Sequence, residues 1–188
     1  MGLTTSRLRL EPATDEHLPL LVELNGDPDV MRFILGRAAT PVETADEWRR
    51  RRELQSDPGR GLGYWVGFRD GAFVGWWSAS SFATDPTQAG LGYRLARSAW
   101  GCGLATEGAI RMVEQAFSSP DIDRVVASTM AVNVASRAVL AKAGLQHVDT
   151  WIGDWEDPLD GWELGEVGYE LTRAGWLAAA PRHPLNHR

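Results

Sequence analysis

The amino-acid sequence predicts a mixed α/β (α+β) fold, in which helices flank a central, mostly antiparallel sheet of about six to seven strands. Two apolar, aromatic-rich runs surround Asp70 and Gly71, a pattern typical of a β-hairpin. The hairpin follows a strand-like run and several helix-like runs, and strand-like and helix-like runs alternate after it. This order predicts that the first half of the sheet is antiparallel.

The first part of the chain carries clear helix signals. Thr40 and Glu43 form a capping box around Pro41, which occupies the first helical position. Gly26 follows the end of an earlier amphipathic run. The elements expected here are a period-two strand over residues 7–11, a helix over 15–25 preceded by Thr14, a short helix over 28–35 and a helix over 41–55.

The second part predicts a hairpin and then alternating strands and helices. A glycine at position 144 stops the second of these helices. The elements expected after the hairpin are strands at 89–96, 124–129, 145–151 and 166–172, with helices at 103–117 and 133–143.

Size and composition indicate one globular domain over residues 1–188, with a core at about 6–173 and a tail at about 177–188. Because Cys102 is the only cysteine, no intrachain disulfide is expected, and a cytoplasmic location is the natural setting. The net charge of −6 argues against nucleic acid as a partner, and no apolar run is long enough for a membrane span. The four histidines show no metal-ligand spacing, so no metal is expected.

A glycine-rich stretch precedes the predicted helix at 103–117. Gly101, Gly103 and Ala105 occupy every second position, so the backbone can approach a ligand closely. The first turn of a helix also offers unpaired N–H groups and a partial positive charge, which together favour an anion. Thr106 departs from a dinucleotide fingerprint, and the Gly-Lys pair of a P-loop is missing. A helix start without a ligand remains the alternative.

The context of this stretch distinguishes these readings. A strand with the sequence LGYRLARSA precedes it, Thr106 and Glu107 continue into the helix, and NVASRAVLAKAGL follows about thirty residues later. In this arrangement the chain resembles the GNAT superfamily of acetyltransferases, and most closely its ribosomal-protein N-acetyltransferase-like branch. The resemblance covers nearly the whole chain. It implies the GNAT fold with a splayed pair of strands, acetyl-CoA as cosubstrate, and direct acetyl transfer to an amine.

The resemblance also implies which residues hold the cosubstrate. The main-chain amides of a loop would bind the pyrophosphate, here Trp100, Gly101, Cys102, Gly103, Leu104, Ala105 and Thr106. Trp100 replaces the usual Gln or Arg, so the amides and the helix dipole must contribute more. The pantetheine arm would pair with Leu95, Ala96 and Arg97. Candidate phosphate partners are Arg97, Arg111, Arg137 and Lys142, each with an ordinary solvated charge as the alternative.

The catalytic residues implied by the family are Tyr93, Asn133 and Ser136. A bulge near Gly92 and Tyr93 would aim a backbone N–H at the thioester oxygen. Asn133 would bind the pantetheine amides, with a simple helix cap as the alternative. Ser136 would lie near the departing sulfur, with helix packing as the alternative. Cys102 is interpreted as a spacer in the loop, since the family transfers the acetyl group directly.

An acidic segment suggests the acceptor site. Residues 149–170 hold eight acidic side chains and no Lys or Arg, together with three tryptophans. Asp154, Trp155 and Glu156 are the substrate-binding candidates, because carboxylates and aromatic faces attract cationic amines. Candidates for the base are Glu107, Asp149, Asp154 and Glu156. A solvated acidic loop is the alternative.

These observations predict an N-acetyltransferase that acts on a protein N-terminus or a small primary amine. An aminoglycoside or polyamine acetyltransferase is the alternative within the family. A catalytically silent acyl-CoA-binding protein is the alternative from another class. Nine tryptophans suggest more apolar surface than a monomer hides, so a homodimer is expected.

Overall fold

A computed structural model shows the fold of residues 2–153 and 158–179. The strands are β1 (Leu3–Thr4), β2 (Arg9–Pro12), β3 (Gly63–Arg69), β4 (Ala72–Ser81), β5 (Gln88–Leu95), β6 (Arg124–Met130), β7 (Gln146–Trp151) and β8 (Glu166–Thr172). The α-helices are α1 (Leu18–Asn25), α2 (Pro28–Met31), α3 (Pro41–Gln55), α4 (Leu104–Phe117), α5 (Val134–Lys142) and α6 (Arg173–Ala179). Short 3₁₀ helices include η1 (Asp15–His17), η2 (Pro58–Arg60), η3 (Arg97–Ala99) and η4 (Trp162–Leu164).

In these described ranges the strands form one sheet of eight, in the order β1-β2-β3-β4-β5-β6-β8-β7. Only β5 and β6 pair in parallel, and the other neighbours are antiparallel. The mixed, mostly antiparallel sheet is therefore confirmed. The expected count of about six to seven strands is too low, because two-residue β1 has no sequence signal of its own and forms only by pairing with β2.

The local signals in the sequence act as expected at the hairpin and the third helix. Asp70 and Gly71 both have positive φ, 51° and 83°, which is the geometry that joins two antiparallel strands by a two-residue turn. Thr40 accepts a hydrogen bond from the Glu43 N–H at 3.2 Å and caps α3. Two helices differ from expectation. The second ends at Met31 rather than at residue 35, and α6 occupies part of the expected tail.

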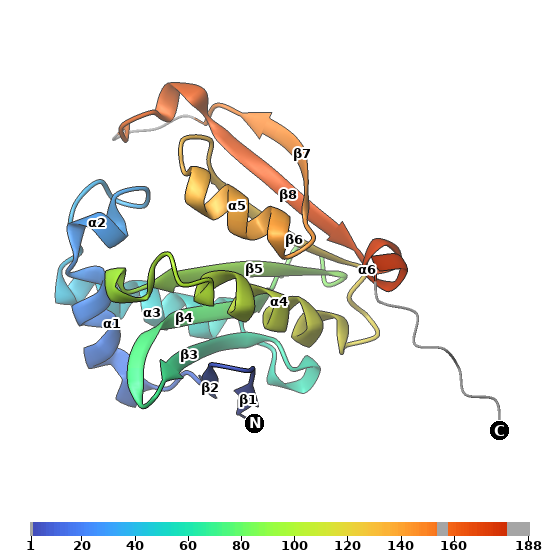
Figure 1. The fold of residues 1–188 in the computed structure, drawn as a ribbon, viewed down its shortest axis with the longest axis horizontal. Helices are drawn as coiled ribbons and strands as arrows, with labels where there is room; N and C mark the ends of the chain where they lie inside the picture. The colour runs from blue at the N-terminus through green and yellow to red at the C-terminus, as the bar shows by residue number, and fades with distance from the viewer. Residues whose placement is uncertain (1, 154–157, 180–188) are drawn as a thin grey trace.

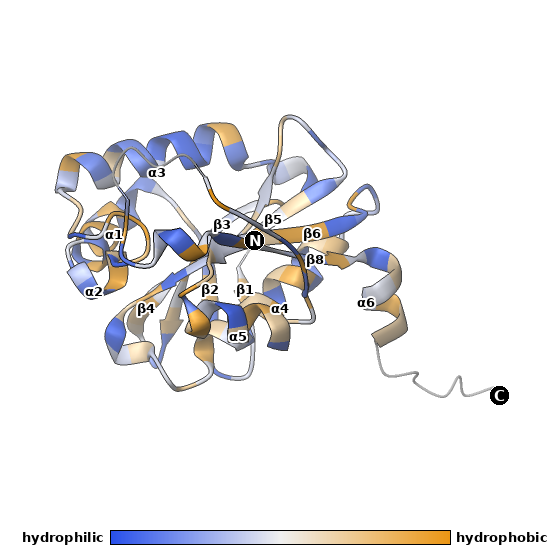
Figure 2. Ribbon diagram, turned by 90° about the horizontal axis from the view of Figure 1, so that it is seen from above, coloured by the Kyte–Doolittle hydropathy of each residue, from blue (hydrophilic) through white to orange (hydrophobic). Residues whose placement is uncertain are grey.

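Helices cover both faces of the sheet, because successive strand residues point to opposite sides (Figure 1). On one face Tyr64, Val66 and Trp76 pack against α1 and α3. On the other face the core joins the sheet to α4 and α5. Figure 2 shows that α3 is largely hydrophilic along its length, as its low share of buried residues requires.

Trp77 fixes the start of α4 against the sheet. Its side chain is fully buried, and its indole N–H donates to the Ala105 carbonyl in the first turn of α4 at 3.2 Å. Gly67 on β3 and Gly108 on α4 leave room for the ring, since a Cβ on either would lie 2.3 or 2.4 Å from an indole atom. The position of this helix start is thus set by core packing.

The two central strands separate after a short parallel contact. Pairing between β5 and β6 is confined to Gln88 with Arg124, Ala89 with Val125, and Gly90 with Val126. Beyond Gly90 the strands diverge, and α5 lies over the opening (Figure 1). The predicted splayed pair is confirmed, and among residues 2–153 and 158–179 no strand pairs with the second edge of β5 in its C-terminal half.

Candidate active site

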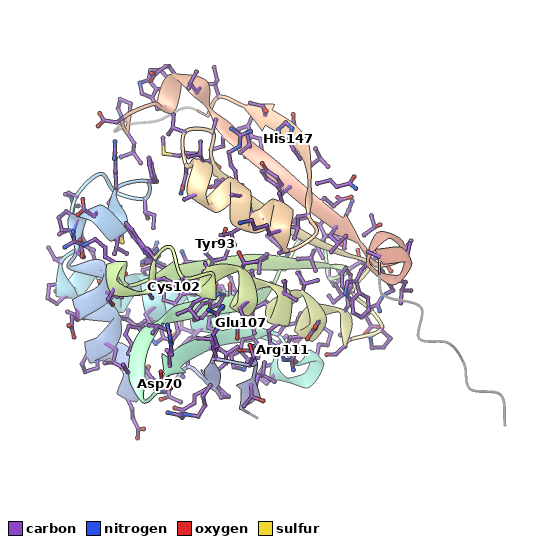
Figure 3. The ribbon with its side chains drawn as sticks, viewed as in Figure 1. Asp70, Tyr93, Cys102, Glu107, Arg111 and His147 are labelled. Carbon is purple, nitrogen blue, oxygen red and sulfur yellow. The ribbon has the colours of Figure 1, made fainter. Side chains whose placement is uncertain are left out.

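The loop before α4 presents a row of main-chain donors. Gly101 and Gly103 have φ of 70° and 79°, a left-handed conformation that favours glycine. Within the described chain, no acceptor is found for the N–H groups of residues 101–106, whereas the Glu107 N–H donates to the Gly103 carbonyl at 3.0 Å. Figure 3 shows Cys102 and Glu107 at this end of α4. The amide cluster and the helix dipole fit a bound anion.

The loop side chains take little of the anion site for themselves. A Cβ on Gly101 would meet no atom within 4 Å. The Trp100 indole N–H donates to the Leu95 carbonyl at 2.9 Å, so this side chain closes the loop onto the end of β5. Cys102 is exposed and its Sγ donates to the Trp100 carbonyl at 3.3 Å.

Residues 95–97 lie at the end of β5, where the strand leaves the sheet. Leu95 is the last strand residue, and the Ala96 N–H donates to the Val74 carbonyl of β4 at 3.0 Å. Arg97 lies in η3 and pairs with Asp27 and Asp29, each at 2.7 Å. Its guanidinium is therefore held by carboxylates, away from the role of a free phosphate ligand.

The free edge of β5 carries the main-chain groups that face the opening. Antiparallel strands bond at alternate residues, so the bond from Ala96 to β4 directs the N–H and C=O groups of Tyr93 and Leu95 to the other side. The expected bulge near Gly92 and Tyr93 is wrong, since the ladder between β4 and β5 has no register shift. Gly92 is required instead by crowding, as a Cβ there would lie 2.7 Å from the Ser78 hydroxyl.

Tyr93 spans the opening and contacts the start of α5. Its hydroxyl lies 2.8 Å from the Ser136 Oγ and donates to the Ser136 carbonyl at 3.1 Å. Burial raises the pKa of Tyr93 to about 12, although the hydrogen bond with Ser136 acts in the opposite direction. The phenol is therefore protonated at neutral pH and acts as a donor.

Asn133 and Arg137 have structural contacts at the same helix. The Asn133 side chain accepts a hydrogen bond from the Ser136 N–H at 3.1 Å and caps α5. Arg137 donates to the Ala131 carbonyl at 3.1 Å and to the Tyr169 hydroxyl at 3.3 Å. The cap brings Ser136 into reach of Tyr93, a constellation that sequence spacing alone did not predict.

Glu107 is held by four donors from the N-terminal segment. It accepts hydrogen bonds from the hydroxyls of Thr5 and Ser6 and from the main chain and guanidinium of Arg7, the last at 2.6 Å. Partial burial raises its pKa, but these bonds outweigh burial and lower it from 4.5 to about 2. A carboxylate this acidic and this fully paired does not serve as a base at neutral pH.

We expect the Glu107 contacts to stabilise the fold near neutral pH and to lose this contribution as the pH falls from about 4.5 to about 2. The folded-state pKa lies below that of the unfolded chain, so protonation favours unfolding. Thermal unfolding of the wild type and of Glu107→Gln is compared between about pH 2 and about pH 7, which isolates the contribution of the Glu107 carboxylate to stability. A difference in melting temperature that is constant with pH would contradict the assignment.

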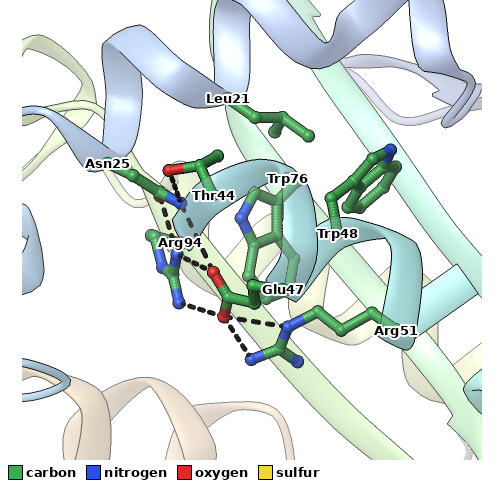
Figure 4. A pocket seen from close by; sticks show the side chains of 8 residues that line it. All are labelled: Leu21, Asn25, Thr44, Glu47, Trp48, Arg51, Trp76 and Arg94. Atoms are coloured by element: carbon green, nitrogen blue, oxygen red, sulfur yellow. Dashed lines mark hydrogen bonds and ion pairs between the residues drawn. The ribbon is translucent and has the colours of Figure 1, made fainter. Parts of the chain in front are cut away.

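A second charged cluster joins β5 to the helices on the opposite face (Figure 4). Arg94 is 6% exposed and donates to Asn25 at 2.6 Å and to Glu47 at 3.1 Å. Arg51 also pairs with Glu47, at 2.8 Å. Burial opposes ionisation of Glu47, but the two guanidinium groups hold its pKa below the usual range. The cluster fixes α1 and α3 to β5, the strand that carries Tyr93. This cluster was not predicted from the sequence.

The acidic segment is described only in part. The acceptor candidates Asp154, Trp155 and Glu156 lie outside the described residues. Asp149 is exposed and accepts a hydrogen bond from the Thr150 N–H at 2.7 Å. Leu159 approaches Gly36, since a Cβ on Gly36 would lie 2.9 Å from Cδ2 of Leu159. The part of the acidic segment around Leu159 therefore lies beside the connection between α2 and α3.

Residues 7–146 match the model of the acetyltransferase (GNAT) domain. The chain belongs to the GNAT family. It is 41% identical over 187 residues to an FsC-acetyl coenzyme A-N(2)-transacetylase of Aspergillus fumigatus, covering 93% of this chain and 77% of that relative. The resemblance drawn from the motifs is thus confirmed, and the protein is an acetyl-CoA-dependent N-acetyltransferase.

Two solved structures show the same GNAT fold. A RimL ribosomal-protein acetyltransferase in complex with coenzyme A has a TM-score of 0.74 and 18% identity, covering 92% of this chain and 98% of the other. A spermidine N-acetyltransferase from Vibrio cholerae with CoA and spermine has a TM-score of 0.74 and 12% identity, covering 92% and 99%.

No group of three or more His, Cys, Asp or Glu in residues 2–153 and 158–179 is placed to hold a metal ion. Across the same ranges, no helix has the length and apolar character that a membrane span requires.

Proposed function

We propose that this GNAT enzyme transfers the acetyl group of acetyl-CoA directly to a primary amine in a ternary complex. The observation that carries the proposal is the opening between β5 and β6, which has unpaired main-chain groups on one side and the Tyr93–Ser136 pair across it. The free amides of residues 101–106 lie at the end of the same strand. Donor binding and acetyl transfer would therefore share one edge of β5.

The donor half of the site uses main chain. The amides of residues 101–106 would bind the pyrophosphate, and the edge of β5 at Leu95 would pair with the pantetheine arm as an added strand. Trp100 already occupies the Leu95 carbonyl, so the Leu95 N–H is the group left for the arm. Ala96 is directed to β4, and Arg97 is paired with carboxylates, which supports a smaller role for these two.

The transfer step needs donors at two atoms of the thioester. The Tyr93 N–H faces the opening and would donate to the carbonyl oxygen, which becomes negative when the amine attacks. The Tyr93 hydroxyl would turn from the Ser136 carbonyl to the departing sulfur, and it would stabilise the sulfur together with the Ser136 hydroxyl. As the carbon–sulfur bond breaks, the sulfur takes the electron pair, and the attacking nitrogen loses one proton to water or a water-linked base.

The acceptor is a small primary amine in this proposal. The relative at 41% identity is named an FsC-acetyl coenzyme A-N(2)-transacetylase, which supports a nitrogen atom as the acetyl acceptor. The acidic segment would form one wall of the acceptor site, with Asp154, Trp155 and Glu156 as its proposed contacts. With Glu107 paired to four donors, Asp149, Asp154 and Glu156 are the remaining candidates for the base.

Acetyl-CoA turnover across an acceptor panel tests this proposal. The panel holds FsC, polyamines, aminoglycosides and N-terminal peptides, and thiol release is measured for each. We expect one small amine to give the highest kcat/KM and N-terminal peptides to give little turnover. Fast turnover of peptides alone would contradict the small-amine acceptor, and slow hydrolysis that no amine accelerates would favour a silent acyl-CoA-binding protein.

Aminoglycosides and polyamines are the second candidate acceptors, since an acidic wall attracts any polycation.

A homodimer and a cytoplasmic location also belong to this proposal. Exposed apolar side chains on and beside the edge strand β7 support the dimer, among them Val148, Trp151 and Ile152.

A further inference from the structure

Arg7 joins the N-terminal segment to the loop before α4, across about a hundred positions of sequence. Its Nη1 donates to the Cys102 carbonyl at 2.8 Å, and its Nε donates to Glu107 Oε2 at 2.6 Å. Its Nη2 lies beside Gly103, where a Cβ would be 3.4 Å away. One guanidinium thus contacts the loop, its last glycine and the first turn of the helix.

The contact with Cys102 sets the direction of a loop amide. In a trans peptide the C=O of one residue and the N–H of the next point in opposite directions. Arg7 binds the Cys102 carbonyl on one side of the loop, so the Gly103 N–H must point to the other side. This amide is one of those without an acceptor in the described chain. Without Arg7, two glycines with positive φ would leave this peptide free to rotate.

The contact with Glu107 concerns charge. A carboxylate in the first turn of a helix interacts well with the helix dipole, but it repels an anion bound at the same end. Glu107 is 15% exposed at its side chain and lies in that turn. The guanidinium of Arg7 and the hydroxyls of Thr5 and Ser6 offset its charge. The helix start can then accept a second anion.

We infer that Arg7 is a positioning residue for the coenzyme A diphosphate, because it orients the Gly103 amide and offsets the charge of Glu107. The inference rests on the proposed function, in which the amides of residues 101–106 hold that diphosphate. A merely structural Arg7 would attach the N-terminal segment to α4 and leave coenzyme A affinity unchanged.

The experiment compares Arg7→Met with Arg9→Met. Arg9 lies on the adjoining strand, pairs with Glu11 and is 54% exposed, so its variant removes the same charge away from the loop. Calorimetry with coenzyme A and the KM values of both substrates are measured. We expect Arg7→Met to weaken coenzyme A and raise the KM of acetyl-CoA about tenfold, with the acceptor KM unchanged. Arg9→Met should match the wild type.

A rescue variant separates charge from folding. Arg7→Met with Glu107→Gln should bind coenzyme A more tightly than Arg7→Met alone, because the unopposed carboxylate is gone. If Arg7→Met does not fold, Arg7→Lys takes its place in the titration. An affinity for coenzyme A that lies between the wild-type value and a loss of about tenfold then supports the inference. Equal affinity of the Arg7 and Arg9 variants, or no gain in the double variant, overturns it.

The same titration distinguishes failure of this inference from failure of the proposed site. Gly101→Asp and Gly101→Asn report on the loop itself, without involving Arg7. If these two bind coenzyme A equally, the loop is not the diphosphate site and both proposals fail. If they differ while the Arg7 and Arg9 variants bind equally, only the role of Arg7 is wrong.

Discussion

Aspartate in place of Gly101 should weaken acetyl-CoA binding about 100-fold relative to asparagine at the same position. The first atom of either side chain has free space, since a Cβ on Gly101 has nothing within 4 Å in the described part of the chain. Both residues tolerate the positive φ of 70° better than other side chains. The pair therefore differs in charge alone, at a loop whose amides are free to bind a diphosphate.

The size of the effect follows from Coulomb's law. At an effective dielectric constant of about 20, the repulsion between a carboxylate and two phosphate charges about 6 Å away is about 5 kcal/mol. Solvent screening at an exposed loop reduces this value, and about 2.7 kcal/mol remains for a 100-fold change, roughly half of the unscreened figure. Calorimetry at two salt concentrations measures it, and the difference should shrink at the higher one. Equal affinities at low salt would show that the diphosphate binds elsewhere.

Local signals in the sequence predicted the elements that frame the site. The hairpin turn at Asp70 and Gly71 needs only neighbouring residues, and β8 spans residues 166–172 as expected. The helix after Gly103 also begins where glycine spacing indicated. In each case a turn or cap within a few residues determines the backbone.

The contacts that position the site could not be predicted in this way. Arg7 meets Glu107 only because the connection between β1 and β2 packs against the start of α4, and nothing near either residue indicates its partner. Arg94 offered a signal, since it is a lone arginine in an apolar strand, yet Glu47 is 47 positions away. The bulge failed for a related reason, because Gly92 serves a close approach of Ser78 across the strand pair.

Removal of the Tyr93 hydroxyl has a second large expected effect. Tyr93→Phe should lower kcat about 100-fold, the usual cost of one lost donor at a developing charge, with the KM of acetyl-CoA unchanged. The phenol lies 2.8 Å from the Ser136 Oγ, so the two hydroxyls form one unit. Ser136→Ala should lose a similar factor, and the double variant should lose little more than either single variant.

The pH dependence shows what the hydroxyl pair does. The pKa of Tyr93 is about 12, far above that of a thiol at about 8.5, so proton transfer from the phenol to the departing thiolate is unfavourable. Tyr93 and Ser136 should therefore stabilise the thiolate by hydrogen bonding, and the acidic and basic limbs of the kcat profile should keep their wild-type positions in Tyr93→Phe. Thermal unfolding of each variant checks that the fold is intact. A shifted basic limb would instead identify Tyr93 as the acid that protonates the sulfur, and an unchanged kcat would remove the pair from the transfer step.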